Sequence, residues 1–135
     1  MKSVSVQKIT PILFVESLEP CVKFWTERMG FEKTIEVPDG DKLAFALLKK
    51  GELEIMYQSF DSADKSDPMV GVLARKGPSF LYIEVADLKE IVTALQGIDL
   101  ASAVHDTFYG AKELSVKDPA GHFISFAQQG AADKQ

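Results

Sequence analysis

Residues 11–31 read PILFVESLEPCVKFWTERMGF, and this stretch contains the signals of a strand, a helix start and a helix end. The apolar β-forming residues at 9–15 predict a strand. A helix is predicted to begin at Ser17, because its side-chain oxygen can accept a hydrogen bond from an otherwise unpaired backbone N–H. Gly30 predicts the end of that helix, since glycine adopts the left-handed conformation without a steric clash.

The same signals return 70 residues later in the chain. The letters VESL at residues 15–18 fall on VADL at residues 85–88 with that shift. A strand is predicted over residues 80–85, a helix start at Asp87 and a helix end at Gly97. The chain therefore contains a duplicated unit.

Each predicted helix has one apolar face to bury. The faces consist of Leu18, Val22, Trp25 and Met29 in the first copy, and of Leu88, Ile91 or Val92, and Leu95 in the second. Three short strands are predicted after each helix, at residues 32–37, 42–49 and 52–57 and at residues 101–106, 112–117 and 122–127. This order predicts an α+β fold of two tandem βαβββ modules whose curved mixed sheets surround a cleft.

The 135 residues are expected to form a single domain. We expect the first module over residues 7–58 and the second over residues 79–128. Residues 59–78 hold glycine, proline and charged residues and are predicted to be a linker or a movable flap. Residues 129–135 are small and polar and are predicted to be a tail.

Composition narrows the class of protein. Hydrophobic residues make up 46% and charged residues 26%, which is typical of a globular chain. The net charge is -5 and no basic cluster exceeds Lys49-Lys50, so nucleic acid is a poor partner. No apolar run reaches the roughly 18 residues of a membrane span, and no secretory signal is visible. The single cysteine, Cys21, cannot form an internal disulfide, and a cytoplasmic location is expected.

The two copies resemble the paired modules of the vicinal oxygen chelate superfamily, which includes glyoxalase I, extradiol dioxygenases and bleomycin resistance proteins. The resemblance covers nearly the whole chain and rests on residues 11–31 and on YGAKELSVKDPAGHFISFAQ at residues 109–128. The second stretch is most similar to the bleomycin resistance branch. In small relatives the modules of different subunits often complete each cleft, so the resemblance implies a homodimer.

The resemblance also locates four strand positions that carry His, Glu or Gln in metal-using members. They fall here on Thr10, Glu54, Phe80 and Ser125. Of these four residues only Glu54 is a good ligand for a divalent ion, and Phe80 offers no donor atom. We therefore expect no metal ion and no other cofactor, and binding rather than metal chemistry.

Alternation of side chains along the strands extends this set, because residues two apart share a face. With Tyr109 and Glu113 included, the expected cleft residues are Thr10, Ile12, Phe14, Glu54, Met56, Phe80, Tyr82, Glu84, Tyr109, Glu113, Phe123 and Ser125. Aromatic rings and carboxylates together favour a cationic or flat aromatic ligand. The alternative is that the carboxylates are solvated and the rings belong to the core. His122 is expected to be a structural histidine.

Three functions are open at this point. The first is a metal-independent protein that binds and sequesters a small molecule such as an antibiotic. The second is a glyoxalase- or dioxygenase-like enzyme, with Glu54 as a general base if burial beside Phe80 raises its pKa. The third is a structural module whose cleft is filled by its own side chains.

Overall fold

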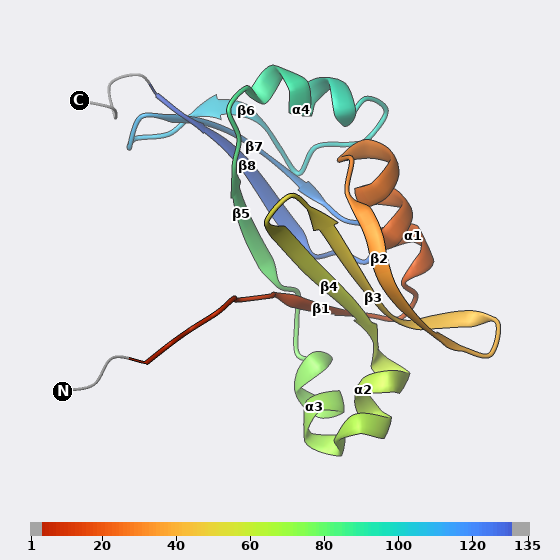
Figure 1. Cartoon of the computed structure of the whole chain (residues 1–135). Coiled ribbons are helices and arrows are strands. Elements are labelled where there is room, and N and C mark those ends of the chain that lie inside the picture. Colours follow the sequence, from red (N-terminus) through yellow and green to blue (C-terminus); the bar gives the residue numbers. More distant parts are fainter. Residues whose placement is uncertain (1–3, 131–135) are drawn as a thin grey trace.

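Two four-stranded sheets form the framework of the computed structural model, which describes residues 4–130 (Figure 1). The first sheet has the strand order β1 (Ile12–Val15), β4 (Leu53–Ser59), β3 (Lys42–Lys50) and β2 (Glu32–Asp39). Strand β1 runs parallel to β4, and the other neighbouring strands are antiparallel. The parallel pair is possible because a helix connects β1 to the rest of the sheet.

The second sheet repeats this arrangement. Its order is β5 (Phe80–Glu84), β8 (Phe123–Gln129), β7 (Ala111–Lys117) and β6 (Ser102–Asp106), with β5 parallel to β8. The predicted α+β fold of two βαβββ modules is therefore confirmed. Of the predicted tail, Gln129 ends β8 and residues 131–135 lie outside the described residues.

The helix of the first module consists of α1 (Glu19–Lys23) and the π-helical turn η1 (Phe24–Arg28). The predicted cap at Ser17 is wrong, because Leu18 occupies the N-cap position and makes no side-chain capping bond. A cap at Ser17 would need N–H donors two or three residues later, and Pro20 has none. The Ser17 hydroxyl instead contacts the carboxylate of Glu19 at 3.2 Å.

The helix of the second module, α4 (Leu88–Ala94), begins as predicted. The Asp87 carboxylate accepts a hydrogen bond from the Lys89 backbone N–H at 3.0 Å. Gly97 has a positive φ of 85° just beyond this helix, as Gly30 has beyond η1 with 74°. No helix within residues 4–130 combines the length and apolarity needed to cross a membrane.

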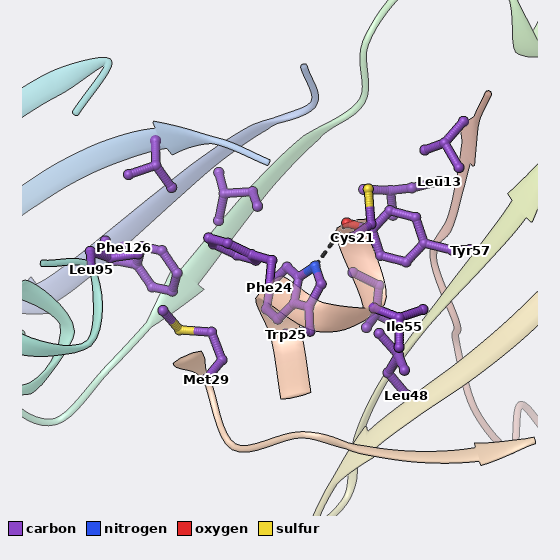
Figure 2. Close-up of a cluster of buried hydrophobic side chains, with 14 of the residues drawn as sticks. Leu13, Cys21, Phe24, Trp25, Met29, Leu48, Ile55, Tyr57, Leu95 and Phe126 are labelled. Carbon is purple, nitrogen blue, oxygen red and sulfur yellow. Dashed lines mark hydrogen bonds between the residues drawn. The ribbon is translucent and has the colours of Figure 1, made fainter. Parts of the chain in front are cut away.

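One hydrophobic core serves both modules (Figure 2). The predicted faces Leu18, Val22, Trp25 and Met29 of the first helix and Leu88 and Leu95 of the second are buried. Ile91 packs against the core whereas Val92 is exposed, which resolves the alternative left by the sequence. In Figure 2 Phe24 and Trp25 lie between Ile55 and Tyr57 of β4 on one side and Leu95 and Phe126 on the other. The first helix therefore packs against both modules.

A buried polar network crosses the same boundary between the modules. The indole N–H of Trp25 donates to the Tyr57 hydroxyl at 2.7 Å, and that hydroxyl donates to Oδ2 of Asp118 at 2.6 Å. Oδ1 of Asp118 accepts the backbone N–H groups of Ala120 and His122 at 2.9 and 2.8 Å. Asp118 thus stabilises its own turn in the second module and binds Tyr57 of β4 in the first module.

Cys21 lies beside this carboxylate, with its sulfur 3.9 Å from Oδ2 of Asp118. Burial, together with the negative charge of Asp118, raises the pKa of the Cys21 thiol to about 12. The thiol is therefore protonated at neutral pH and behaves as a small buried hydrophobe.

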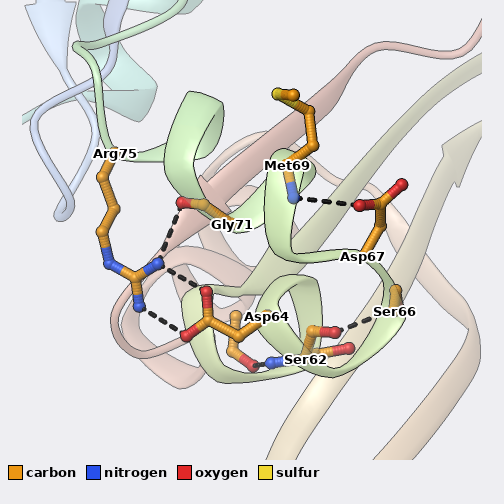
Figure 3. A network of polar contacts seen from close by, with 8 residues as sticks. Ser62, Asp64, Ser66, Asp67, Met69, Gly71 and Arg75 are labelled. Carbon is orange, nitrogen blue, oxygen red and sulfur yellow. Dashed lines mark hydrogen bonds and ion pairs between the residues drawn. The ribbon is translucent and has the colours of Figure 1, made fainter.

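The segment predicted to be a linker or flap forms two short helices, α2 (Phe60–Ser66) and α3 (Pro68–Ala74), at one end of the first sheet (Figure 1). The Arg75 guanidinium binds both carboxylate oxygens of Asp64, at 2.7 and 2.9 Å (Figure 3). Gly71 allows the close approach of the helices, because a Cβ there would lie 1.9 Å from Asp64 Oδ1. Movement of this segment stays a prediction.

Replacing Asp118 with alanine should destabilise the protein by about 3 kcal/mol or more, because the Tyr57 hydroxyl and two backbone N–H groups would lose their acceptor. Urea unfolding followed by Trp25 fluorescence measures this loss. Asp41→Ala removes an exposed carboxylate in a turn and should change stability by less than about 0.5 kcal/mol. A cost for Asp118→Ala as small as that of the control would contradict the bridging role.

Candidate ligand-binding cleft

Each sheet has one face turned away from the shared core. We call these surfaces the first open face, formed by β1 to β4, and the second open face, formed by β5 to β8. On the first open face, Ile12 of β1 pairs with Met56 of β4. Phe14 and Glu54 lie two residues away on the same strands and therefore share this face. Ile35 and Val37 of β2 continue this face and are about half exposed. The first open face is thus largely apolar.

Glu54 is the one carboxylate on the first open face that the sequence singled out, and it is fully engaged. Thr10 donates a hydrogen bond to it at 2.5 Å, and the Nζ atoms of Lys8 and Lys49 lie 3.0 and 3.9 Å away. Its side chain is only 5% exposed. Hydrogen bonds from Thr10 and then from Lys8 hold the pKa of Glu54 below its usual value.

This direction is opposite to the one that a general base would need. The hypothesis for Glu54 as a base required burial beside Phe80 to raise its pKa, whereas the hydrogen bonds from Thr10 and Lys8 lower that pKa. An ionised carboxylate that is already satisfied by a hydroxyl and an ammonium group accepts a proton poorly. The condition under which Glu54 could act as a base, a raised pKa, is therefore not met.

The second open face carries the aromatic residues. The rings of Phe80 and Phe123 are 5.5 Å apart on neighbouring strands, and Phe80 is 72% exposed. Tyr82 pairs with Ser125 across β5 and β8. The Ser125 hydroxyl forms a hydrogen bond of 2.8 Å with that of Ser115. The predicted residues of this face therefore lie together, and the serine pair occupies its centre.

Glu113 is the distinctive group of the second open face. Its Oε2 atom accepts hydrogen bonds from the Tyr82 hydroxyl at 2.7 Å and from the Tyr109 hydroxyl. The residue is 8% exposed, and no Lys, Arg or His of residues 4–130 forms an ion pair with it. The hydrogen bond to Glu113 raises the pKa of Tyr109. A mostly buried carboxyl group is thus held here by two phenols.

Several residues near these groups were not predicted. Lys8 and Lys49 determine the charge around Glu54, and Gln129 binds Glu84 at 2.9 Å. Phe108, next to Tyr109 in the β6–β7 loop, is 99% exposed, with its ring packed edge-on against that of Tyr109 at 5.0 Å. Alternation could have pointed to Lys8, which lies two residues before Thr10.

A cavity of about 620 Å³ lies where the two modules approach each other. Three of the predicted cleft residues line it, namely Glu54, Tyr82 and Glu84. Trp25 and Phe31 also line it, and they belong to the core or its margin. The other predicted residues lie on the two open faces outside this cavity, so their convergence on one hollow stays a prediction.

The four positions matched to metal ligands do not suit a divalent ion. The Thr10 hydroxyl donates to Glu54, and the Ser125 hydroxyl is bonded to Ser115. Phe80 has no donor atom, so Glu54, which already binds Thr10 and Lys8, would be the one carboxylate to hold the ion. Within residues 4–130 no three His, Cys, Asp or Glu side chains gather as a metal site would require.

A second cavity of about 400 Å³ lies between α3 and the Asp118 turn, with Arg75 and His122 on its wall. Nδ1 of His122 accepts the Ser79 backbone N–H at 2.8 Å, so Nε2 carries the proton that it donates to the Phe14 carbonyl, also at 2.8 Å. Both ring nitrogens are used, and Arg75 is occupied by Asp64. His122 is the structural histidine that the sequence predicted.

Solved structures of similar fold come from several bacteria. A glyoxalase/bleomycin resistance protein/dioxygenase from Nocardioides aligns with a TM-score of 0.73 and 17% identity over 96% of this chain and 87% of its own. Lactoylglutathione lyase from Agrobacterium tumefaciens gives 0.72 and 16% over 92% and 95%. The bleomycin-binding protein of Streptomyces verticillus, complexed with copper(II)-bleomycin, gives 0.62 and 23% over 95% and 99%.

These identities are low, and the structural likeness alone shows the fold. No curated protein matches the sequence significantly. The family model described as Glyoxalase/Bleomycin resistance protein/Dioxygenase superfamily matches residues 6–126, which is most of the chain. With its two βαβββ modules, the chain belongs to this superfamily.

Proposed function

We propose that this protein binds a planar small molecule that is cationic or aromatic, without a metal ion, and acts by sequestering it. Members of the superfamily bind small molecules, as the bleomycin-binding protein does. The observation that carries the proposal for this chain is Glu113, a buried carboxylate without an ionic partner among residues 4–130. A cation on the ligand would supply the missing partner.

The contrast with Glu54 supports placing the cation on the second open face. Glu54 already has two lysines within 4 Å, so a further positive charge near it would meet repulsion. Among residues 4–130 the hydrogen-bond donors to the Glu113 side chain are the phenols of Tyr82 and Tyr109, and His105 stands opposite it on β6 without an ion pair. Both oxygens of a carboxylate can accept, and the hydrogen bonds to the tyrosines use Oε2, which leaves Oε1 for the ligand.

Aromatic rings of the second open face would hold the flat part of the ligand. Tyr82 and Tyr109 bind Glu113 directly, and the two phenylalanines lie farther along the same sheet, where Phe123 pairs with Lys117. Phe80 and Phe123 form a tilted pair, and Phe108 is free to cover a ligand from the β6–β7 loop. A cation over an aromatic face gains about 0.5–1 kcal/mol when exposed and about 2 kcal/mol when water is excluded. Charge and stacking together would then select a cationic aromatic compound over a neutral one.

A homodimer would complete the cleft. Ile12, Ile35, Val37, Phe80 and Tyr82 leave much of their apolar surface exposed, and both open faces turn away from the core of their own chain. Exposed apolar surface on two faces favours association. A second copy placed with its second open face against the first open face of its partner would bring Glu54 and Glu113 of different chains into one cleft.

An enzyme is the second candidate, since the fold is shared with a lactoylglutathione lyase. Glyoxalase- or dioxygenase-like chemistry would need a Lewis acid or a base in the cleft. Only Glu54 of the four metal positions is a good ligand, and its pKa is lowered, so neither requirement is well supported. Sequestration in the cytoplasm is therefore the function that we prefer.

The ligand proposal predicts that 9-aminoacridine, a planar cation, binds more tightly than neutral acridine. Isothermal titration should show Glu113→Gln weakening 9-aminoacridine at least tenfold, or about 1.4 kcal/mol, because the charge is lost. Glu90→Gln removes an exposed carboxylate from α4 and should leave affinity unchanged. Equal affinities for the two dyes, or equal effects of the two variants, would contradict the role of Glu113.

The hydrogen-bonded cluster of Glu113, Tyr82 and Tyr109 also predicts that Tyr109 has a raised pKa. The neutral phenol of Tyr109 is stabilised as a donor to Glu113, so it should ionise above the usual tyrosine range. Glu113→Gln should lower the pKa of Tyr109 toward its ordinary value, because the amide carries no charge. The phenolate absorbance of wild type minus that of Tyr109→Phe isolates this group. A Tyr109 that titrates normally in the wild type would argue against the cluster.

Metal analysis separates binding from metal-dependent catalysis. Protein purified without chelator should contain well below one equivalent of transition metal, since the donor set is poor. Turnover of hemithioacetals of glyoxals and of catechols should stay at background with added Zn²⁺, Ni²⁺, Mn²⁺ or Fe²⁺. Stoichiometric metal together with turnover would contradict sequestration and support the second candidate, a metal-dependent enzyme.

A further inference from the structure

Strand β7 places an acidic and a basic residue on the second open face. Leu114 and Val116 of this strand are buried in the core. Because side chains alternate along a strand, Glu113, Ser115 and Lys117 lie on the opposite side of the sheet. A carboxyl group and an ammonium group therefore share one surface, with a serine between them.

The pairing of strands arranges this surface in three rows of side chains. From one end of the face to the other, the rows are Lys117 with Phe123 and Phe80, then Ser115 with Ser125 and Tyr82, then Glu113 with Ala127 and Glu84. The basic end of the face is therefore also its phenylalanine end. The acidic end is the one where the tyrosine hydroxyls bind Glu113.

Both end groups lack an ionic partner in the part of the chain that the structure describes. Lys117 is exposed and forms no ion pair with an Asp or Glu of residues 4–130. Its neighbours in the row are phenylalanine rings, which offer no anionic oxygen. Glu113 at the other end binds only through Oε2, to two hydroxyl groups. Each end of the second open face can therefore still bind a charged group of opposite sign.

The two end groups are too far apart to satisfy each other. They stand four residues apart on one strand, which places their Cα atoms about 14 Å apart. Charges that far apart are largely screened at physiological ionic strength. On the first open face, in contrast, Lys49 pairs directly with Glu54 across β3 and β4, and its Nζ lies 3.9 Å from that carboxylate. Only the second open face leaves opposite groups separated.

The middle row forms a low floor between the two ends. Ser115 is 5% exposed, and its short side chain is bonded to that of Ser125 at 2.8 Å. Tyr82 and Phe80 remain exposed on β5 beside this floor. A flat or slender molecule that rests on the serines would contact these rings along one side. Its two ends would then meet the carboxyl group and the lysine.

We propose that the ligand of the second open face is a zwitterion, with a cation that binds Glu113 and an anionic oxygen group, such as a carboxylate, that binds Lys117. A simple cation would leave the ammonium group of Lys117 without a partner. Since both side chains can lean toward the ligand, ligand charges about 10 Å apart fit the span between the two Cα atoms. This inference rests on the proposed function, because it assumes the cation site at Glu113, and it does not depend on the homodimer.

Two matched acridines test the anionic end by isothermal titration. At neutral pH 6-(acridin-9-ylamino)hexanoic acid is a zwitterion, and 6-(acridin-9-ylamino)hexanamide is the cation without the carboxylate. At low ionic strength the wild type should bind the acid at least about fivefold more tightly than the amide, or about 1 kcal/mol. Lys117→Gln should bring the ratio of the two affinities to about one. Lys89→Gln removes an exposed lysine from α4 and should keep the wild-type ratio. Equal affinities of the wild type for the two compounds, or equal effects of the two variants, would overturn the inference.

Reversal of the charge at residue 117 gives an outcome that a general loss of structure would not produce. Lys117→Glu should prefer N-(acridin-9-yl)hexane-1,6-diamine, which ends in an ammonium group, over the acid, whereas the wild type should prefer the acid. A Lys117→Glu protein that still prefers the acid would contradict the role of Lys117.

Binding of 9-aminoacridine, which has no anionic group, separates this inference from the proposed function. If Glu113 is needed for 9-aminoacridine but the acid and the amide bind equally, the zwitterion is refuted and the cation site remains. If neither 9-aminoacridine nor either of the matched acridines binds, both proposals are refuted.

Discussion

The buried carboxylate of Asp118 is the interaction on which the arrangement of the modules depends. It is 3% exposed and accepts hydrogen bonds from Tyr57 of β4 and from the turn that precedes β8. A buried charge without such donors would cost several kcal/mol. The turn before β8 is therefore fixed at a position where Asp118 reaches the Tyr57 hydroxyl. Because Trp25 extends the same network, the first helix, the first sheet and the second sheet are fixed together.

This constraint explains why the open faces lie on the outside. One helix, α1 with η1, contributes to a core that contains Leu13 of the first sheet and Phe126 of the second. The core-facing sides of both sheets are consequently used within the chain. The opposite sides retain Ile35, Val37 and Phe80 in exposed positions, and they are the surfaces left for a ligand or a second copy.

Much of the fold could be predicted because it follows local rules. The repeat at an offset of 70 residues gave the two modules, and alternation correctly assigned Ile12, Met56, Phe80 and Tyr82 to faces turned away from the core. The glycines at 30 and 97 ended helices, since positive φ is a property of the residue itself. Alternation and the glycine signal require only neighbours in sequence, and the repeat requires only a comparison of the chain with itself.

The predictions that the structure does not confirm concern features set by contacts between distant residues or by neighbouring residues with opposing preferences. Ser17 does not cap its helix because Pro20 removes a donor, and the sequence contains both of these opposing signals. The helices α2 and α3 are held by the Arg75 pair with Asp64, eleven residues apart, rather than by a long apolar pattern. The charge at Glu54 depends on Lys8, which comes from outside the predicted strands.

The two copies of the βαβββ unit have diverged in charge, and this difference has a structural meaning. The carboxylate of the first open face is neutralised by Lys8 and Lys49, whereas that of the second is held by Tyr82 and Tyr109. Pairing two first faces would join surfaces without an unsatisfied charge, and pairing two second faces would set Glu113 against Glu113. Pairing unlike faces avoids that repulsion. A two-fold axis can satisfy this preference twice at once, so the asymmetry within one chain favours a symmetric pair of chains.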